Sequence, residues 1–144
     1  MLIIKDPSTI KVGYTKELLK NNKTTSELAE KNKALCAVNS SLPLIENGKP
    51  LLSKNTMWEI NPRTAIAQKK DGTVIMVVID GRNTNSIGIS LFKLQQLLIK
   101  EGAYTAAALD GGSSSTMYYK DGIINKPAYS NGQQPVSSIF MVEK

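Results

Sequence analysis

Two arginines and two aspartates are the residues of this chain best suited to bind and transform a charged substrate. Among its eighteen Lys and Arg residues only Arg63 and Arg82 are arginines, and histidine is absent. A guanidinium holds a phosphate or carboxylate through two parallel hydrogen bonds, which an ammonium group cannot do. Asp80 and Asp110 each follow an apolar run and each precede a glycine. Because histidine, the commonest general base, is missing, acid–base chemistry falls to these carboxylates.

A run of small polar residues follows Asp110 and suits close contact with an anion. Paired glycines allow positive φ and close backbone approach, and successive N–H groups form anion-binding nests. A flexible loop is the alternative interpretation of the same run. A serine nucleophile is disfavoured, since no histidine can activate it. The run supplies five candidate contacts to phosphate or sugar, and a sixth, weaker one ends an apolar run earlier in the chain: Gly111, Gly112, Ser113, Ser114, Ser115 and Asn39.

The elements around the two aspartates predict that both lie at one edge of a sheet. Val74–Ile79 and residues 104–109 are apolar runs of strand length, and Ser90 caps a helical pattern between them. A strand–helix–strand crossover is right-handed and makes its two strands parallel. Their carboxyl ends then share one edge, so we expect the Asp80 and Asp110 carboxylates within roughly 10 Å of each other.

Turn signals elsewhere predict antiparallel hairpins. Asn47-Gly48, Asp71-Gly72 and Asp121-Gly122 each separate two apolar segments. Residues 24–27 form a capping-box pattern that opens a first helix, and residues 1–6 are typical of a strand. We predict an α+β fold in a single domain spanning residues 1–144. It has a mixed, mainly antiparallel sheet with hairpins, one parallel strand–helix–strand crossover and two principal helices.

Composition narrows the classes of partner. The chain has 144 residues, 41% hydrophobic content and a net charge of +6, which are typical of a globular protein. Basic residues are not interleaved with aromatics, so no nucleic-acid partner is expected, and no apolar stretch is long enough to span a membrane. The lone Cys36 is interpreted as a small buried hydrophobe. The start lacks the pattern of a signal peptide, although a chain trimmed of its leader would look the same.

No cofactor is expected from the sequence. Histidine is absent, cysteine is single and no EF-hand spacing occurs, so the usual metal-ligand patterns are missing. The two aspartates with neighbouring hydroxyls leave open a hard cation such as Mg²⁺ or Ca²⁺.

Taken together, the polar clusters resemble those of the phosphodiester glycosidase family. The order and spacing of the clusters carry the resemblance, which spans nearly the whole chain: Ile4-Lys5-Asp6-Pro7-Ser8, Asn61-Pro62-Arg63-Thr64-Ala65, Val78-Ile79-Asp80-Gly81-Arg82, residues 109–117 and Asn125-Lys126-Pro127.

The resemblance implies hydrolysis of a sugar-1-phosphodiester of the N-acetylglucosamine type, releasing the sugar from a phosphorylated acceptor. It implies that Arg63 and Arg82 hold the phosphodiester and that Asp80 or Asp110 acts as base or nucleophile. The hydrolysis could either retain or invert the configuration at the anomeric carbon, and the sequence does not decide between the two. The resemblance further implies an extracellular or cell-envelope location, as for bacterial members associated with exopolysaccharide. The oligomeric state is left open.

Two departures from the family pattern favour an alternative function. A Gly-Gly run followed by aromatics is usual after the amide, where this chain has Ser40-Ser41-Leu42-Pro43, and the segment between residues 41 and 61 is short. Gln134 stands where an arginine is usual. The alternative is therefore a catalytically weak or inactive module that binds phosphorylated or anionic glycans.

Overall fold

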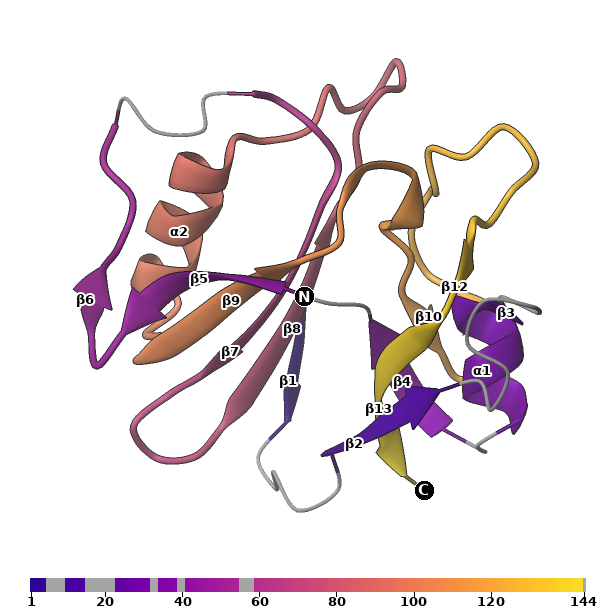
Figure 1. Cartoon of the computed structure of the whole chain (residues 1–144), viewed down its shortest axis with the longest axis horizontal. Helices are drawn as coiled ribbons and strands as arrows, with labels where there is room; N and C mark the ends of the chain where they lie inside the picture. Colours follow the sequence, from indigo (N-terminus) through magenta and orange to yellow (C-terminus); the bar gives the residue numbers. More distant parts are fainter. Residues whose placement is uncertain (5–9, 15–22, 32–33, 39–40, 55–58, 144) are drawn as a thin grey trace.

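The computed structural model places the chain in two packed sheets, each with a helix on its outer face (Figure 1). It describes residues 1–4, 10–14, 23–31, 34–38, 41–54 and 59–143. The first sheet has six strands in the order β1 (Leu2–Ile4), β8 (Val74–Ile79), β7 (Arg63–Gln68), β9 (Thr105–Leu109), β5 (Ser41–Glu46) and β6 (Lys49–Pro50).

The second sheet has five strands, in the order β11 (Gly122–Ile123), β10 (Tyr118–Tyr119), β4 (Ala34–Val38), β13 (Ser138–Glu143) and β2 (Ile10–Tyr14). A two-stranded ribbon pairs β12 (Pro135–Val136) with β3 (Lys23–Thr24). Together with the helices α1 (Thr25–Lys31) and α2 (Leu91–Lys100), these strands form the predicted α+β fold. In the described part of the chain, neither helix is long and apolar enough to cross a membrane.

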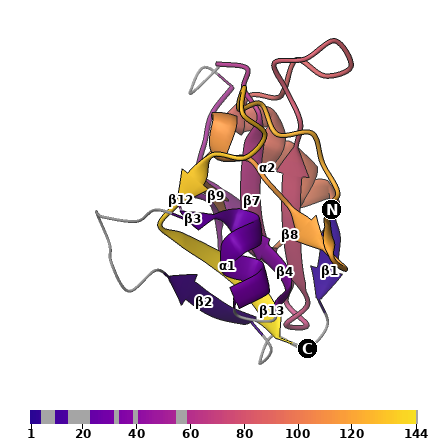
Figure 2. The ribbon, with the colours of Figure 1, turned by 90° about the vertical axis from the view of Figure 1, so that its right-hand side faces the viewer.

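Three apolar clusters hold these layers together. The first joins α2 to one face of the first sheet through residues such as Leu94, Leu98 and Ala65. The second joins the opposite face of that sheet to the second sheet, and includes Met76 and Val142. A third cluster lies between α1 and the second sheet. The order of layers is therefore α2, first sheet, second sheet and α1; Figure 2 shows α1 lying across the second sheet.

Both helices begin at the predicted caps. The Glu27 carboxylate accepts from Thr24 N at 2.7 Å, and Thr24 Oγ1 accepts from Glu27 N at 3.2 Å, which is a reciprocal capping box. Ser90 Oγ accepts from Lys93 N at the start of α2. Gly102, at φ +83°, ends that helix in the left-handed conformation. Local sequence signals therefore set the helix boundaries.

The crossover has the predicted direction but passes over an intervening strand. β8 and β9 both pair antiparallel with β7, which lies between them, so they run parallel to each other without sharing hydrogen bonds. The hairpin at Asp71-Gly72 makes β7 the neighbour of β8, and β9 then pairs with the other edge of β7. Every strand pair in the described residues is antiparallel.

The hairpins form where the sequence predicts them, with one shift. Asn47 and Gly48 occupy the turn between β5 and β6, both at positive φ. In the last hairpin Tyr119 pairs with Gly122, so the turn residues are Lys120 and Asp121 rather than Asp121 and Gly122. The pairing of Tyr119 with Gly122 leaves two residues for the turn, which both adopt the left-handed conformation at φ 45° and 69°.

A buried amide in α2 holds the chain that follows β6. Gln95 is fully buried; its Oε1 accepts from Leu51 N and Leu52 N, and its Nε2 donates to Leu52 O. These bonds satisfy Leu52 N and Leu52 O, and they give a second acceptor to Leu51 N, which also donates to Leu44 O of β5 at 2.9 Å. The sequence does not predict this role of Gln95, because helical spacing alone does not distinguish a buried amide from a solvated one.

Candidate functional site

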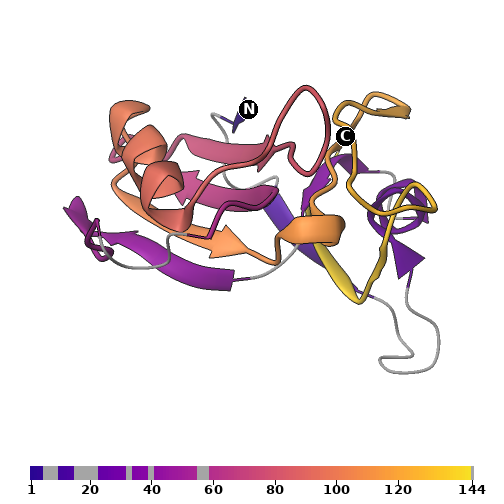
Figure 3. The ribbon, with the colours of Figure 1, turned by 90° about the horizontal axis from the view of Figure 1, so that it is seen from above.

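Arg63, Asp80 and Asp110 lie at the same edge of the first sheet. Arg63 begins β7 opposite Ile79, the last residue of β8, and Thr64 lies opposite Leu109, the last residue of β9. The chain therefore leaves β8 and β9 on either side of the start of β7. Figure 3 looks onto this edge, where the loop after β8 and the turn after β9 come together. The strand directions thus bring these three predicted residues to one region.

The loop after β8 folds back tightly on the start of β7. Asn61 and Ile89 pair through two backbone hydrogen bonds, of 3.3 and 2.9 Å. A Cβ on Gly88 would lie 2.4 Å from the Asn61 carbonyl atoms, and a Cβ on Gly81 would lie 2.9 Å from Pro62 N. Side chains at these two positions would push the segments apart, so both glycines are required for the contact.

Arg82 connects the segment before β7 to the turn after β9. Its backbone is left-handed at φ +55°, an uncommon conformation for a residue with a side chain. Its Nε and Nη2 donate to Asn61 Oδ1 at 3.2 and 2.8 Å, and its Nη1 donates to Ser113 Oγ at 3.4 Å. The guanidinium also lies against Gly112, where a Cβ would be 3.5 Å from Nη2. Residues from two segments, the one before β7 and the turn after β9, thus fix one exposed guanidinium.

Arg63 is held on the α2 side of the same edge. Its Nε donates to Ile89 O at 3.1 Å and its Nη2 donates to Glu59 O at 2.7 Å. Burial lowers the pKa of Arg63, the Glu59 carboxylate opposes that shift, and the positive charge of Arg82 adds to it. Arginine stays protonated at neutral pH despite such a shift. The effect of Arg82 on this pKa shows that the two cations repel each other.

The two guanidiniums have only neutral oxygens as hydrogen-bond partners among the described residues. These are the Ile89 and Glu59 carbonyls, the Asn61 amide oxygen and the Ser113 hydroxyl. Neutral partners orient a guanidinium but do not cancel its charge; the Glu59 carboxylate offsets only part of the charge of Arg63. Such an arrangement suits a phosphate, whose negative charge and several oxygens match two positive forks.

The turn after β9 presents fewer side chains to a ligand than the sequence predicted. Gly112 N donates to Pro62 O at 2.8 Å, which ties the short 3₁₀ helix Gly112–Ser114 to the start of β7. Ser113 is half-buried and contacts Arg82, whereas Ser114 and Ser115 are 3% and 1% exposed. Of the three serines, Ser113 is therefore the one placed to meet a ligand. Asn39, the remaining predicted contact, lies outside the described residues. The side chain of Cys36, predicted to be buried, is also outside what the structure describes.

Unpaired buried hydroxyls gather behind this turn. In the described part of the chain, the buried side-chain polar atoms without a partner are Thr64 Oγ1, Ser115 Oγ and Thr116 Oγ1. Thr64 shares a face of β7 with Ile66, which packs toward the second sheet. Most buried polar groups are hydrogen-bonded, so such a concentration is unusual and marks this edge as distinct from the rest of the core.

The two aspartates have different surroundings. Asp80 Oδ1 accepts from Asn125 Nδ2 at 2.9 Å, and both of its carboxylate oxygens accept from Lys126 N at 3.0 and 3.2 Å. Asn125 also accepts from Met117 N and donates to Ser115 O. Asp80 is therefore part of a network that fixes the chain after the turn. Asp110 is exposed at the sheet edge.

The described residues contain no cluster of three or more His, Cys, Asp or Glu side chains able to hold a metal ion.

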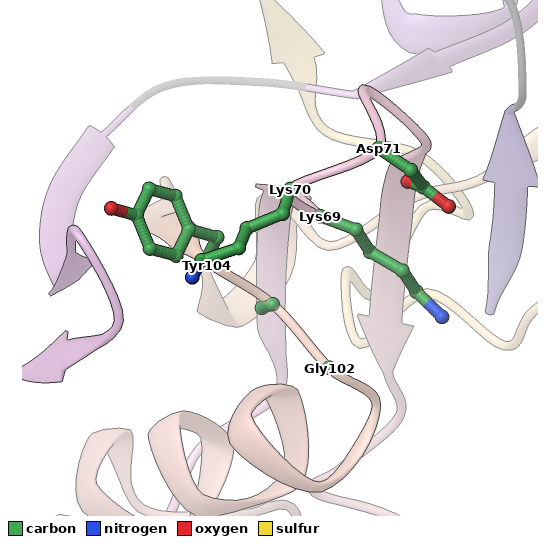
Figure 4. A pocket seen from close by; sticks show the side chains of 6 residues that line it. Lys69, Lys70, Asp71, Gly102 and Tyr104 are labelled. Atoms are coloured by element: carbon green, nitrogen blue, oxygen red, sulfur yellow. The ribbon is translucent and has the colours of Figure 1, made fainter.

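A separate hollow of about 380 Å³ lies at the opposite end of the first sheet (Figure 4). It is formed by the loop between β7 and β8 and by the residues before β9. Lys70 Nζ lies 4.9 Å from the centre of the Tyr104 ring, and Gly48 packs close to the same ring. Because the lysine and the glycine both lie against this ring, the hollow does not present it as a free aromatic surface for a ligand.

Comparisons with known proteins agree with this geometry. A family model described as phosphodiester glycosidase matches residues 4–143. The chain is 37% identical over 86 residues to the SPbeta prophage-derived uncharacterized protein YomE of Bacillus subtilis (strain 168), a match that covers 57% of this chain. It is 30% identical over 69 residues, 48% of this chain, to the N-acetylglucosamine-1-phosphodiester alpha-N-acetylglucosaminidase of Bos taurus. The matched segment is 13% of the length of each of these relatives.

A solved structure shows a similar fold. The catalytic domain of the zebrafish N-acetylglucosamine-1-phosphodiester alpha-N-acetylglucosaminidase, auto-inhibited by its pro-peptide, superposes with a TM-score of 0.79. The superposition covers 95% of this chain and 73% of the zebrafish chain at 14% identity, so it shows a shared fold. With the family model matching nearly all of its residues, this chain belongs to the phosphodiester glycosidase family.

Proposed function

We propose that this chain binds a sugar-1-phosphodiester, of the N-acetylglucosamine type, and hydrolyses it to release the sugar. The observation that carries the proposal is the pair Arg63 and Arg82, which have only neutral hydrogen-bond partners in the described residues. They lie at the end of the sheet where β9 leads into Asp110. A phosphodiester bound there has its negative charge neutralised. The same contacts strengthen as the phosphate leaves with an additional charge, which lowers the barrier.

The proposed reaction breaks the bond between the anomeric carbon and the phosphate oxygen. The bonding electrons go to the phosphate oxygen, which the arginines stabilise, and the acceptor leaves as a phosphate monoester. Water supplies the oxygen that bonds to the anomeric carbon, and Asp110 accepts the proton of that water or first attacks the carbon itself. Ser113 and the backbone of Gly111 and Gly112 orient the phosphate or the sugar. We assign Asp80 a positioning role, because Asn125 and Lys126 occupy its oxygens.

A second candidate is a module that binds phosphorylated glycans with little or no turnover. Glycosidases of this chemical type use two carboxylates beside the scissile bond. In this chain the Asp80 carboxylate is engaged by Asn125 and Lys126, which constrains one member of the pair. The short segment between residues 41 and 61 also favours loose positioning of the sugar, which costs about 100-fold or more in rate. We therefore expect slow catalysis with anion binding intact.

Two measurements on one sample distinguish these functions. Isothermal calorimetry with inorganic phosphate and N-acetylglucosamine-1-phosphate measures binding, and release of free sugar from UDP-N-acetylglucosamine or a methyl ester of the same sugar phosphate measures turnover. Binding with slow sugar release supports the weak hydrolase, and binding with no release supports the second candidate. Turnover near the typical enzyme value of roughly 10 s⁻¹ would show that the engagement of Asp80 does not prevent fast catalysis. No binding of either anion would refute both.

We further propose that the activity acts outside the cell or in the cell envelope, on exopolysaccharide or wall polymers that contain sugar phosphodiesters. The support is the family resemblance of the clusters around Arg63 and Asp110. Incubation of the protein with purified phosphodiester-containing exopolysaccharide tests the proposal. Release of reducing sugar from that polymer supports it, whereas release from UDP-N-acetylglucosamine alone contradicts it.

A further inference from the structure

An apolar groove of about 320 Å³ lies between the loop after β8 and the start of α2. Its apolar wall consists of Ile60, Ile87, Ile89 and Phe92, and Lys54 and Lys93 contribute the charged groups of the lining. Ile87 is 70% exposed and Ile60 is 51% exposed. Apolar side chains gathered in an exposed hollow offer a surface on which an apolar group can be removed from water.

The groove shares its backbone with the arginine pair. Ile89 lines the groove, and its carbonyl accepts from Arg63 Nε at 3.1 Å. Ile60 also lines it, and the next residue, Asn61, holds Arg82. Asn61 and Ile89 pair with each other, so one folded segment contributes both to the groove and to the positioning of the arginines. A ligand whose phosphate lies at the arginines therefore has the groove beside the same segment.

We propose that this groove binds an apolar chain or ring carried on the acceptor side of the phosphodiester substrate. The inference rests on the proposed function, since it takes the phosphate to lie at Arg63 and Arg82. The sugar is the poorer occupant, because its hydroxyls would lose water against isoleucine side chains without gaining partners. Lys54 and Lys93 extend the positive charge of the arginine pair along the groove, which matches the negative phosphate that precedes the apolar group.

The size and charge of the groove disfavour a protein partner. Its volume lies in the range of small-molecule sites, about 300–1,000 Å³. A second copy of the chain would bring two lysine-containing surfaces together in a protein of net charge +6, which opposes association. The groove therefore suits a small apolar group attached to the phosphate on the acceptor side, such as an alkyl or prenyl chain.

Alkyl phosphates of increasing length test the groove directly. Inorganic, methyl, butyl and hexyl phosphate, titrated by calorimetry below their aggregation concentrations, should bind with affinity that rises about two- to fourfold per added methylene. In the Ile87→Ser variant this rise should flatten while the affinity for inorganic phosphate stays unchanged. Ile87 is mostly exposed, so its replacement leaves the core intact. Ile124→Ser is the matched control, since Ile124 is 56% exposed and does not line the groove.

The outcomes separate this inference from the function on which it rests. Equal affinity for methyl and hexyl phosphate, with inorganic phosphate still bound, overturns the groove and leaves the anion site standing. Failure to bind any of the phosphates removes the proposed function and the groove inference with it. An equal loss of chain-length dependence in Ile124→Ser shows nonspecific adsorption and also overturns the groove. Dimerisation that Ile87→Ser abolishes, measured by sedimentation velocity, shows that a second copy fills the groove instead.

Discussion

Arg82 donates from both Nε and Nη2 to a single acceptor, the amide oxygen of Asn61, at 3.2 and 2.8 Å. A neutral acceptor fixes the plane of the guanidinium and leaves its full charge for a ligand. Asn61 belongs to one of the motifs that carry the family resemblance, yet the sequence did not indicate this role. An amide next to a proline equally suits a turn, and only the fold brings it to an arginine that is 21 residues away along the chain.

Replacing Arg82 by lysine should weaken phosphate binding while keeping the charge. The lysine ammonium lacks the planar fork, so it cannot contact Asn61 and a phosphate in fixed directions. We expect a loss of about 1–3 kcal/mol in binding free energy for inorganic phosphate, measured by calorimetry. Lys49→Ala is the control, because Lys49 is exposed on β6, away from the arginines. Unchanged phosphate affinity in Arg82→Lys would place the anion elsewhere.

Asp110→Asn should remove sugar release and keep phosphate binding. The substitution preserves size and removes the base or nucleophile, and we expect a fall in rate of at least about 100-fold. Phosphate affinity should stay equal or increase, since a negative charge near the arginines is lost. Turnover of a sugar-1-phosphodiester and calorimetry with phosphate are measured on the same preparation. A variant that retains the turnover of the original chain would transfer the catalytic role to another group.

Asp80→Ala should lower stability and act through Asn125. Removing the carboxylate leaves Asn125 Nδ2 and Lys126 N without this acceptor, which costs about 1–3 kcal/mol in the free energy of unfolding. Asn125→Ala should cost a similar amount, and the double variant should cost clearly less than the sum, because both changes break one network. Urea unfolding of the four proteins measures this. Additive losses would show that the two residues act independently.

Gly88→Ala should disturb the arginine site more than an equally strained glycine elsewhere. Gly88 has φ +101° and a Cβ there would lie 2.4 Å from the Asn61 backbone, whereas Gly132 has φ +94° and nothing within 4 Å of its Cβ position. Both alanines carry the cost of a left-handed backbone, about 1 kcal/mol or more. Only Gly88→Ala displaces Asn61, so only that variant should also lose phosphate affinity. Equal phosphate affinity in the two variants contradicts the tight contact.

Gln95→Leu should destabilise the fold, because the Gln95 side chain bonds backbone groups of the segment that follows β6. The leucine fills similar space but leaves Leu52 N and Leu52 O without their partner, at a cost of about 1–3 kcal/mol in the free energy of unfolding. Leu51 N keeps Leu44 O as its acceptor. Gln96→Leu is the matched control, because Gln96 is exposed on the same helix. Thermal and urea unfolding compare the two. A larger loss for Gln96→Leu would show that helix propensity, and not the amide contacts, dominates.

Local signals predicted the elements well, and long-range contacts account for what was missed. The capping box at Thr24 and Glu27 and the cap at Ser90 involve residues three apart, so they can be read from the sequence. The shared edge of Asp80 and Asp110 followed from strand direction alone. The engagement of Asp80 by Asn125 could not be predicted, because these residues are 45 apart and an Asn before Lys-Pro is an ordinary turn residue.

The position of β13 sets the time at which this protein can fold during synthesis. β13 lies between β4 and β2 in the second sheet, and it contains the last described residues of the chain. β2 pairs with no strand other than β13 among the described residues, so the early strand waits for the late one. Completion of the second sheet therefore follows emergence of Ser138–Glu143 from the ribosome, and until then the apolar face of the first sheet lacks part of its packing partner.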